Sequence, residues 1–147
     1  MNGSIICGVD GSPGAQEALR VAAQLSGQLG SRLVVAHVTR RQVSGPDPAP
    51  PGIAPEEAEI AAAEHLVEEL VLAEGLVDAK RCVALGLPAE GLADLADDEG
   101  AGLIVVGSRG RGAFKAAFLG SVSNELIGVA RCPVVVVPQG ATGVQAA

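Results

Sequence analysis

Residues 103–112 read Leu-Ile-Val-Val-Gly-Ser-Arg-Gly-Arg-Gly, an apolar run that passes directly into a glycine-rich segment. Residues 103–106 are apolar without interruption, which is typical of a strand that is buried on both faces of a parallel sheet. The glycines that follow let the backbone turn with positive φ and come close to neighbouring groups. The stretch therefore predicts a central strand of an α/β sheet that ends in a tight, glycine-rich turn.

Short apolar runs alternate with helical patterns on both sides of this strand. Such alternation, with short connections, indicates a parallel sheet with helices on both faces, because right-handed crossovers place the helices there. We therefore predict a doubly wound, five-stranded, Rossmann-like α/β fold. The predicted strands are 4–9, 33–38, 81–85, 103–107 and 134–137, and the predicted helices are 13–29, 55–74, 88–99 and 121–131.

The apolar residues of the first two predicted helices repeat at helical spacing. Ser12 and Pro13 suit the start of the first helix, and Gly30 suits its end. We expect the inward faces to be Ala15, Ala18, Leu19, Ala22, Ala23, Ser26 and Leu29 on the first helix, and Ala58, Ala61, Ala62, Leu66, Leu70 and Ala73 on the second.

The chain has 147 residues, the length of one ordinary domain, which we place at 1–138. Residues 40–54 are proline-rich and are predicted to form a mobile loop, and residues 139–147 are predicted to be a disordered tail. No apolar run approaches the roughly 20 residues of a membrane span, and the N-terminus lacks the basic region of a signal peptide. We expect a cytoplasmic protein that does not contact a membrane.

Composition argues against two other classes of protein. The formal net charge is −7 and the chain has no Trp or Tyr, whereas nucleic-acid binding depends on basic and stacking side chains. Cys7, Cys82 and Cys132 are far apart and form no C-x-x-C pair. We interpret them as reduced packing residues rather than metal ligands, and we expect no nucleic-acid partner.

The glycine-rich segment from Gly107 to Ser123 has the features of an anion site. Its backbone N–H groups can converge on phosphate oxygens, and Ser121 and Ser123 add hydroxyl donors at the start of a predicted helix. No Asp or Glu occurs from 101 to 124, whereas Arg109, Arg111 and Lys115 are basic. This pattern favours a bound polyphosphate; the alternative is a flexible surface loop in which Ser121 only begins the helix.

The spacing of these residues resembles that of a known family. Gly107-x-x-Gly110, nine residues and then Gly120-Ser121 match the G-2x-G-9x-G-[ST] pattern of ATP-binding universal stress proteins. Residues 9–12, 36–38 and 130–134 also resemble family segments. The resemblance implies the strand order 3-2-1-4-5, a homodimer formed through the last strand, and ATP as the ligand, with Mg²⁺ or Mn²⁺ able to bridge its phosphates.

The resemblance also assigns roles to single residues. It implies that Asp10 contacts the ribose and that the backbone of Val38 meets adenine. The phosphate-binding set that it implies is Val106, Gly107, Arg109, Gly110, Gly120, Ser121 and Val122, with Ser123 extending it.

Several of these residues also have simpler interpretations. The alternative for Asp10 is a simple turn residue before a Ser12 helix cap, and Val38 would be buried in either case. We interpret His37 as a strand-end residue with a satisfied ring. The sequence departs from the family pattern at Gly102, where relatives commonly carry an acidic residue, and we expect locally weaker structure there.

The sequence predicts nucleotide binding with at most slow hydrolysis. Hydrolysis needs a group that positions or deprotonates water, and the glycine-rich segment contains no carboxylate. The nucleotide would then act as a signal in a stress response. The alternative is an ATP-independent structural or interaction protein that acts through its dimer surface. Nucleotidyl-transfer enzymes are disfavoured because neither H-x-G-H nor S-G-G-x-D-S occurs.

Overall fold

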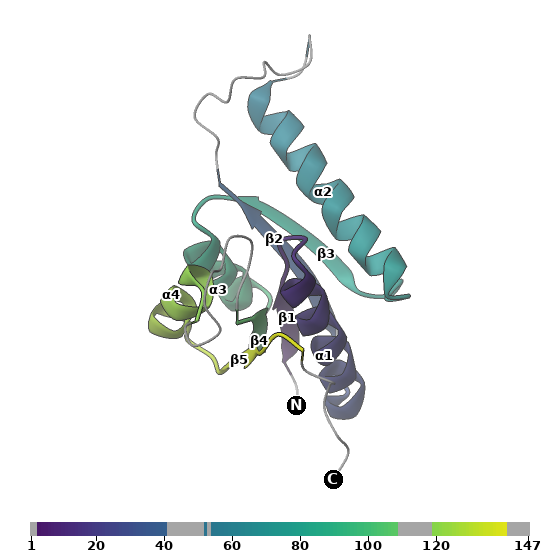
Figure 1. The fold of residues 1–147 in the computed structure, drawn as a ribbon, viewed down its shortest axis with the longest axis vertical. Coiled ribbons are helices and arrows are strands. Elements are labelled where there is room, and N and C mark those ends of the chain that lie inside the picture. The colour runs from purple at the N-terminus through teal and green to yellow at the C-terminus, as the bar shows by residue number, and fades with distance from the viewer. Residues whose placement is uncertain (1–2, 41–51, 53, 109–118, 141–147) are drawn as a thin grey trace.

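The computed structural model describes residues 3–40, 52, 54–108 and 119–140. In this part of the chain, strands and helices alternate as the sequence predicts (Figure 1). The elements are β1 (Ser4–Gly8), α1 (Pro13–Leu29), β2 (Leu33–Thr39), α2 (Pro55–Ala73), β3 (Lys80–Leu85), α3 (Pro88–Asp98), β4 (Ala101–Gly107), α4 (Ser121–Val129) and β5 (Val134–Val137).

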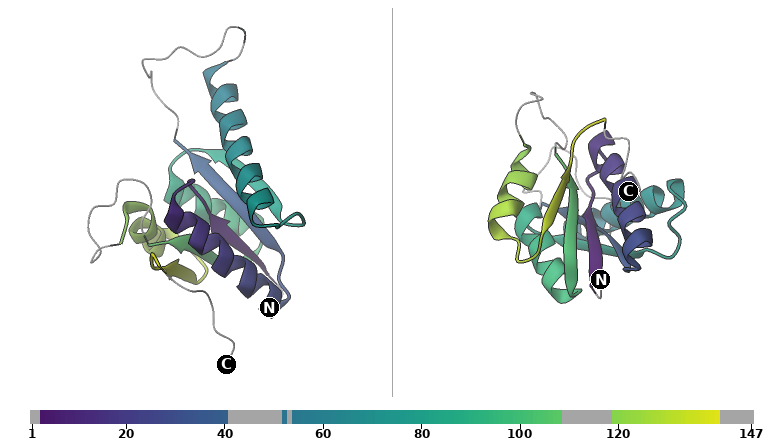
Figure 2. Two further views of the ribbon diagram at one scale, coloured as in Figure 1. Left: turned by 45° about the vertical axis from the view of Figure 1, so that its right-hand side comes forward. Right: turned by 90° about the horizontal axis from the view of Figure 1, so that it is seen from below.

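The strands form one parallel sheet in the order β3-β2-β1-β4-β5, which confirms the order that the family resemblance implied. Helices α1 and α2 cover one face and α3 and α4 cover the other, as the view along the sheet in Figure 2 shows. The predicted doubly wound, Rossmann-like fold is therefore confirmed. The chain reverses its winding between β1 and β4, and ligands of such sheets bind at this point.

Helix α1 begins and ends at the predicted residues. The Ser12 hydroxyl oxygen accepts a hydrogen bond from the Ala15 N–H at 3.2 Å, and Pro13 occupies the first turn. Gly30 ends the helix with φ 63°, a left-handed conformation that favours glycine. Ala15, Ala18, Leu19 and Ala22 of the predicted inward face are buried, Ala23 and Ser26 are half-buried, and Leu29 at the end of the helix is exposed.

Helix α2 buries its predicted inward face only in part, since Ala58, Leu66 and Leu70 are half-buried. Its buried residues are Ala63, Val67 and Val71, whereas Ala61, Ala62 and Ala73 are exposed. The helix carries apolar residues on several sides, so an alanine pattern cannot fix which side faces the sheet. The two β-branched residues, spaced by four, bury more apolar surface than alanines do, and they decide the orientation.

Each face of the sheet has its own core. Ile5, Cys7 and Val35 pack under α1 and α2, and Ile6 and Ile104 pack under α3 and α4. Burial raises the pKa of the Cys7 thiol to about 12. Cys82 and Cys132 are half-buried free thiols, so all three cysteines are unpaired as the sequence predicted.

Strand β4 begins at Ala101, two residues earlier than predicted, despite Gly102. Its pairing with β1 shifts register between Ser4 and Ile5, so that Gly102 lies at an irregularity of the ladder. A Cβ atom on Gly3 would lie 2.8 Å from the Gly102 nitrogen. The glycines therefore allow the two backbones to approach closely, and the sheet extends where we expected weaker structure.

Some predictions fall on other parts of the chain. Most of the predicted loop 40–54 and residues 141–147 of the predicted tail lie outside the described residues. Gln139 and Gly140 are described, and the Gly140 N–H donates to Glu17 Oε2 at 2.8 Å, so the chain still contacts α1 there. Among the described residues, no helix is long and apolar enough to cross a membrane.

Candidate functional site

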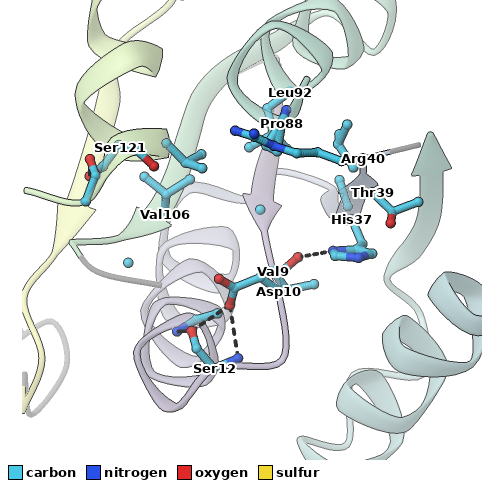
Figure 3. Close-up of a pocket in the computed structure, with 18 of the residues that line it drawn as sticks. Val9, Asp10, Ser12, His37, Thr39, Arg40, Pro88, Leu92, Val106 and Ser121 are labelled. Carbon is cyan, nitrogen blue, oxygen red and sulfur yellow. Dashed lines mark hydrogen bonds between the residues drawn. The ribbon is translucent and has the colours of Figure 1, made fainter. Parts of the chain in front are cut away.

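A cleft of about 560 Å³ lies at the carboxyl ends of β1, β2 and β4. This volume is within the usual range for small-molecule sites. Arg109 and Gly110, two of the ten predicted binding residues, lie outside the described residues. The other eight line the cleft, namely Asp10, Val38, Val106, Gly107, Gly120, Ser121, Val122 and Ser123 (Figure 3).

Asp10 follows β1 and takes part in the turn that leads into α1. Its Oδ1 atom accepts the Ser12 N–H at 3.0 Å and the Ser12 hydroxyl at 2.5 Å (Figure 3). No hydrogen bond from a described residue reaches its other oxygen, Oδ2. The two interpretations of Asp10 are therefore compatible, because one oxygen closes the turn while the second stays available to a ligand's hydroxyl groups.

The start of α4 presents backbone donors that make no hydrogen bond to another described residue. Gly120 precedes the helix and has no side chain that accepts a hydrogen bond from the first turn. The N–H groups of Ser121, Val122 and Ser123 consequently have no acceptor within the helix. All three residues line the cleft, so the positive end of the helix dipole acts on it as well. This arrangement suits an anionic group.

Ser123 lies in the cleft but does not offer the free hydroxyl that the sequence suggested. Its side chain is only 2% exposed, and the hydroxyl donates to the carbonyl oxygens of Ser108 at 3.2 Å and Gly120 at 3.0 Å. The Gly120 N–H also donates to Ser108 at 2.6 Å. These bonds join the end of β4 to the start of α4, so the Ser123 side chain positions the helix rather than contacting a ligand directly.

Gly107 ends β4 where the strand meets the first turn of α1. A Cβ atom at this position would lie 2.9 Å from the Gly14 carbonyl oxygen. Any larger residue would push the two segments apart. The sequence suggested that this glycine lets the backbone approach a ligand, and the structure adds that it lets the start of α1 approach the strand end.

Three buried side chains form an apolar wall of the cleft. Val38, Leu92 and Val106 are each at least 94% buried and contribute to it. Gly91 on α3 packs so closely that a Cβ there would lie 2.6 Å from Val38 Cγ1. The wall comes from β2, α3 and β4, and it is held in place by direct helix-to-strand contact.

His37 also lines the cleft, and its ring is satisfied as predicted. The Nδ1 atom lies 2.6 Å from the Val9 carbonyl oxygen, which makes Nδ1 the protonated nitrogen. Sequence reasoning missed several other lining residues, among them Leu66, Pro88, Leu92 and Arg40. Arg40 carried a signal, since it comes directly after the second strand. Leu66 and Pro88 join the cleft only through packing of α2 and α3.

Metal binding by the protein alone has no support in the described part of the chain. No group of three or more His, Cys, Asp or Glu side chains is arranged to hold an ion there. Asp10 is the one carboxylate among the described lining residues. The cleft thus combines an apolar wall, a carboxylate and a helix N-terminus, which can accommodate a flat ring, hydroxyl groups and an anion, respectively.

The fold and the cleft define a doubly wound α/β protein with a ligand site at its topological switch point. The model of the universal stress protein family matches residues 1–138. The chain belongs to this family.

Individual relatives agree with this assignment. A Thermus aquaticus protein, "Universal stress protein in QAH/OAS sulfhydrylase 3'region", is 34% identical over 140 residues, covering 91% of this chain and 97% of the relative. The solved UspA of Lactobacillus plantarum has a TM-score of 0.74 at 21% identity, with coverage of 92% and 97%. A universal stress protein solved in complex with cAMP has a TM-score of 0.66 at 24% identity, with coverage of 92% and 96%. These two structures share the fold.

Proposed function

We propose that this protein binds an adenine nucleotide, preferentially ATP, and that it serves as a nucleotide-dependent factor in a cytoplasmic stress response. The observation that carries the proposal is the first turn of α4, which no described side chain caps and whose residues line a cleft with an apolar wall. Support also comes from a solved family member that holds cAMP, itself an adenine nucleotide.

The three parts of a nucleotide correspond to three parts of the cleft. The phosphates would lie at Gly107 and at the start of α4, where helix N-termini favour anions. The ribose hydroxyls would donate to Asp10, whose Oδ1 is already fixed by Ser12. The adenine would lie at the apolar wall near Val38. Arg109 and Gly110 would complete the phosphate site, as the sequence pattern implies.

The chemistry expected of this site is binding, with at most slow hydrolysis. A Mg²⁺ or Mn²⁺ ion would supply charge neutralisation at the phosphates and would be carried mainly by the nucleotide itself. Asp10 is committed to the turn through one oxygen and to the ribose in our assignment. A bound nucleotide would stabilise the folded form and shift the equilibrium with any partner that distinguishes the two states.

The test is calorimetric titration of nucleotide-free protein with ATP and Mg²⁺, beside AMP, cAMP and GTP. The informative variant is Ser121→Glu, because Ser121 is exposed at the first position of α4. A carboxylate there stabilises the helix through its dipole but repels phosphates. We expect an unchanged or raised Tm and ATP binding that is at least about tenfold weaker.

Ser121→Gln is the matched control, because glutamine has nearly the same size as glutamate but carries no charge. This variant should bind ATP with an affinity within a few-fold of that of the original protein. Denaturing the purified protein to look for released nucleotide provides an independent readout. Absence of ATP binding by the original protein, with no nucleotide released, would contradict the proposal. The ATP-independent interaction protein would then be the better description.

A further inference from the structure

Arg40 is a cationic residue at the cleft that the nucleotide assignment does not use. It follows β2 directly, lines the cleft and is exposed. Its guanidinium makes no hydrogen bond or ion pair with another described residue. In Figure 3 the side chain extends from the end of β2 across the cleft in the direction of Pro88, the first residue of α3.

A flat ring in the cleft would have one face covered and one face open. Val38, Leu92 and Val106 offer an apolar wall to the first face. Proteins often cover the second face with an aromatic side chain, but the chain has no Trp or Tyr, and Phe114 and Phe118 lie outside the described residues. A guanidinium is planar and stacks on aromatic rings, so it can replace an aromatic residue in this position.

We infer that Arg40 is a positioning residue that stacks over the adenine ring and holds it against the wall formed by Val38, Leu92 and Val106. The inference rests on the proposed nucleotide binding and specifies how the base is held.

The order of the strands separates Arg40 from the phosphates. Arg40 leaves β2, Asp10 leaves β1, and Gly107 ends β4, and these strands are neighbours in that order in the sheet. The anion-favouring start of α4 follows β4. The backbone of Arg40 and the start of α4 therefore lie on opposite sides of β1, with Asp10, the ribose position in our assignment, between them.

The experiment measures dissociation constants of ATP by calorimetry and of adenosine by NMR titration, for the original protein, Arg40→Ala and Arg40→Lys. Stacking on the base contributes equally to the binding of ATP and of adenosine. Arg40→Ala should therefore lower both affinities by the same factor, about three- to tenfold. Arg40→Lys keeps the charge but loses the planar group, and it should not restore the affinity. Arg20→Ala removes one positive charge outside the cleft and should leave both constants unchanged.

Each other outcome overturns the inference in a different way. If Arg40→Ala loses much more affinity for ATP than for adenosine, Arg40 contacts the phosphates rather than the base. Full rescue by lysine would show that charge alone matters. Unchanged affinities in Arg40→Ala, with ATP still bound by the original protein, would reject the stacking role while leaving the nucleotide proposal intact. No binding by the original protein would reject both.

Discussion

Gly91 lies on α3 where the helix meets Val38. A methyl group added at this position therefore tests how tightly the helix packs against the apolar wall of the cleft. Alanine normally stabilises a helix relative to glycine. Here its Cβ would lie 2.6 Å from Val38 Cγ1, closer than packed carbon atoms come. We expect Gly91→Ala to lower the free energy of unfolding by about 1 kcal/mol, because overpacking outweighs the gain in helix propensity. Urea denaturation measures the change.

Gly27 on α1 is the matched control for Gly91. It also lies within a helix, but a Cβ there would have nothing within 4 Å. Gly27→Ala should therefore raise stability by about 0.5–1 kcal/mol. Equal stabilisation by both alanines would show that Val38 and α3 adapt without cost. The apolar wall would then be softer than the contact distances indicate.

Glu99, which ends α3, joins several elements at the amino-terminal end of the sheet. Its carboxylate accepts hydrogen bonds from Lys80 Nζ at 2.5 Å and Arg32 Nη2 at 3.0 Å, and its backbone carbonyl accepts the Ser4 hydroxyl at 2.9 Å. The hydrogen bond from Lys80 lowers the pKa of the Glu99 carboxyl. The cluster thus connects α3 with the starts of three strands, far from the cleft.

The lowered pKa of Glu99 sets the direction of its pH dependence. A carboxyl whose pKa is lower in the folded state stabilises the protein above its unfolded pKa and loses that contribution as pH falls through its folded pKa. Glu99→Gln should lower the Tm at pH 7 by a few degrees. The Tm values of variant and original should converge as the pH drops below about 4.

Glu64→Gln is the control for Glu99→Gln. Glu64 is exposed on α2 and makes no hydrogen bond or ion pair with another described residue. Its replacement should leave the Tm nearly unchanged at both pH values. If the Tm of Glu99→Gln differs from that of the original protein by the same amount at every pH, packing rather than charge accounts for the role of Glu99.

At the scale of the whole molecule, no described strand pairs with the outer edge of β5. Within the described part of the chain, β5 pairs only with β4, and the Pro133 and Val137 carbonyls face that neighbour. In a parallel ladder, the backbone groups of Val134 and Val136 then point to the free edge. Ile127 and Val129 on α4 are 55% and 42% exposed. Free edges and exposed apolar residues favour association, so we propose a homodimer through β5.

Light scattering of the protein as it elutes from a size-exclusion column should give a mass twice the 14.6 kDa of one chain. Val136→Pro removes an outward N–H while leaving the hydrogen bonds to β4, so it should shift the protein towards monomer. Val136→Ile keeps the N–H and should remain dimeric. A dimer that survives the proline would place the interface elsewhere, and a monomeric original protein would reject the dimer.

Much of the fold could be predicted from the chain alone. Apolar periodicity, the Ser12–Pro13 start and the Gly30 end depend on neighbouring residues, so the elements and their parallel arrangement followed from local pattern. The site was partly predictable for the same reason. Strand ends in a parallel sheet meet at one edge, which brought Asp10, Val38 and the residues around Gly107 and Gly120 into one cleft.

The sequence by itself thus determined the helices, the strands, the unpaired N–H groups at α4 and the acid after β1, because each depends on local hydrogen bonding and residue type. Only the tertiary structure decided which side of α2 is buried, that Gly91 packs against Val38, that the Ser123 hydroxyl is used within the protein, and that Arg40 extends over the cleft. Those contacts join segments far apart in the chain, and their distances depend on how whole helices pack on the sheet.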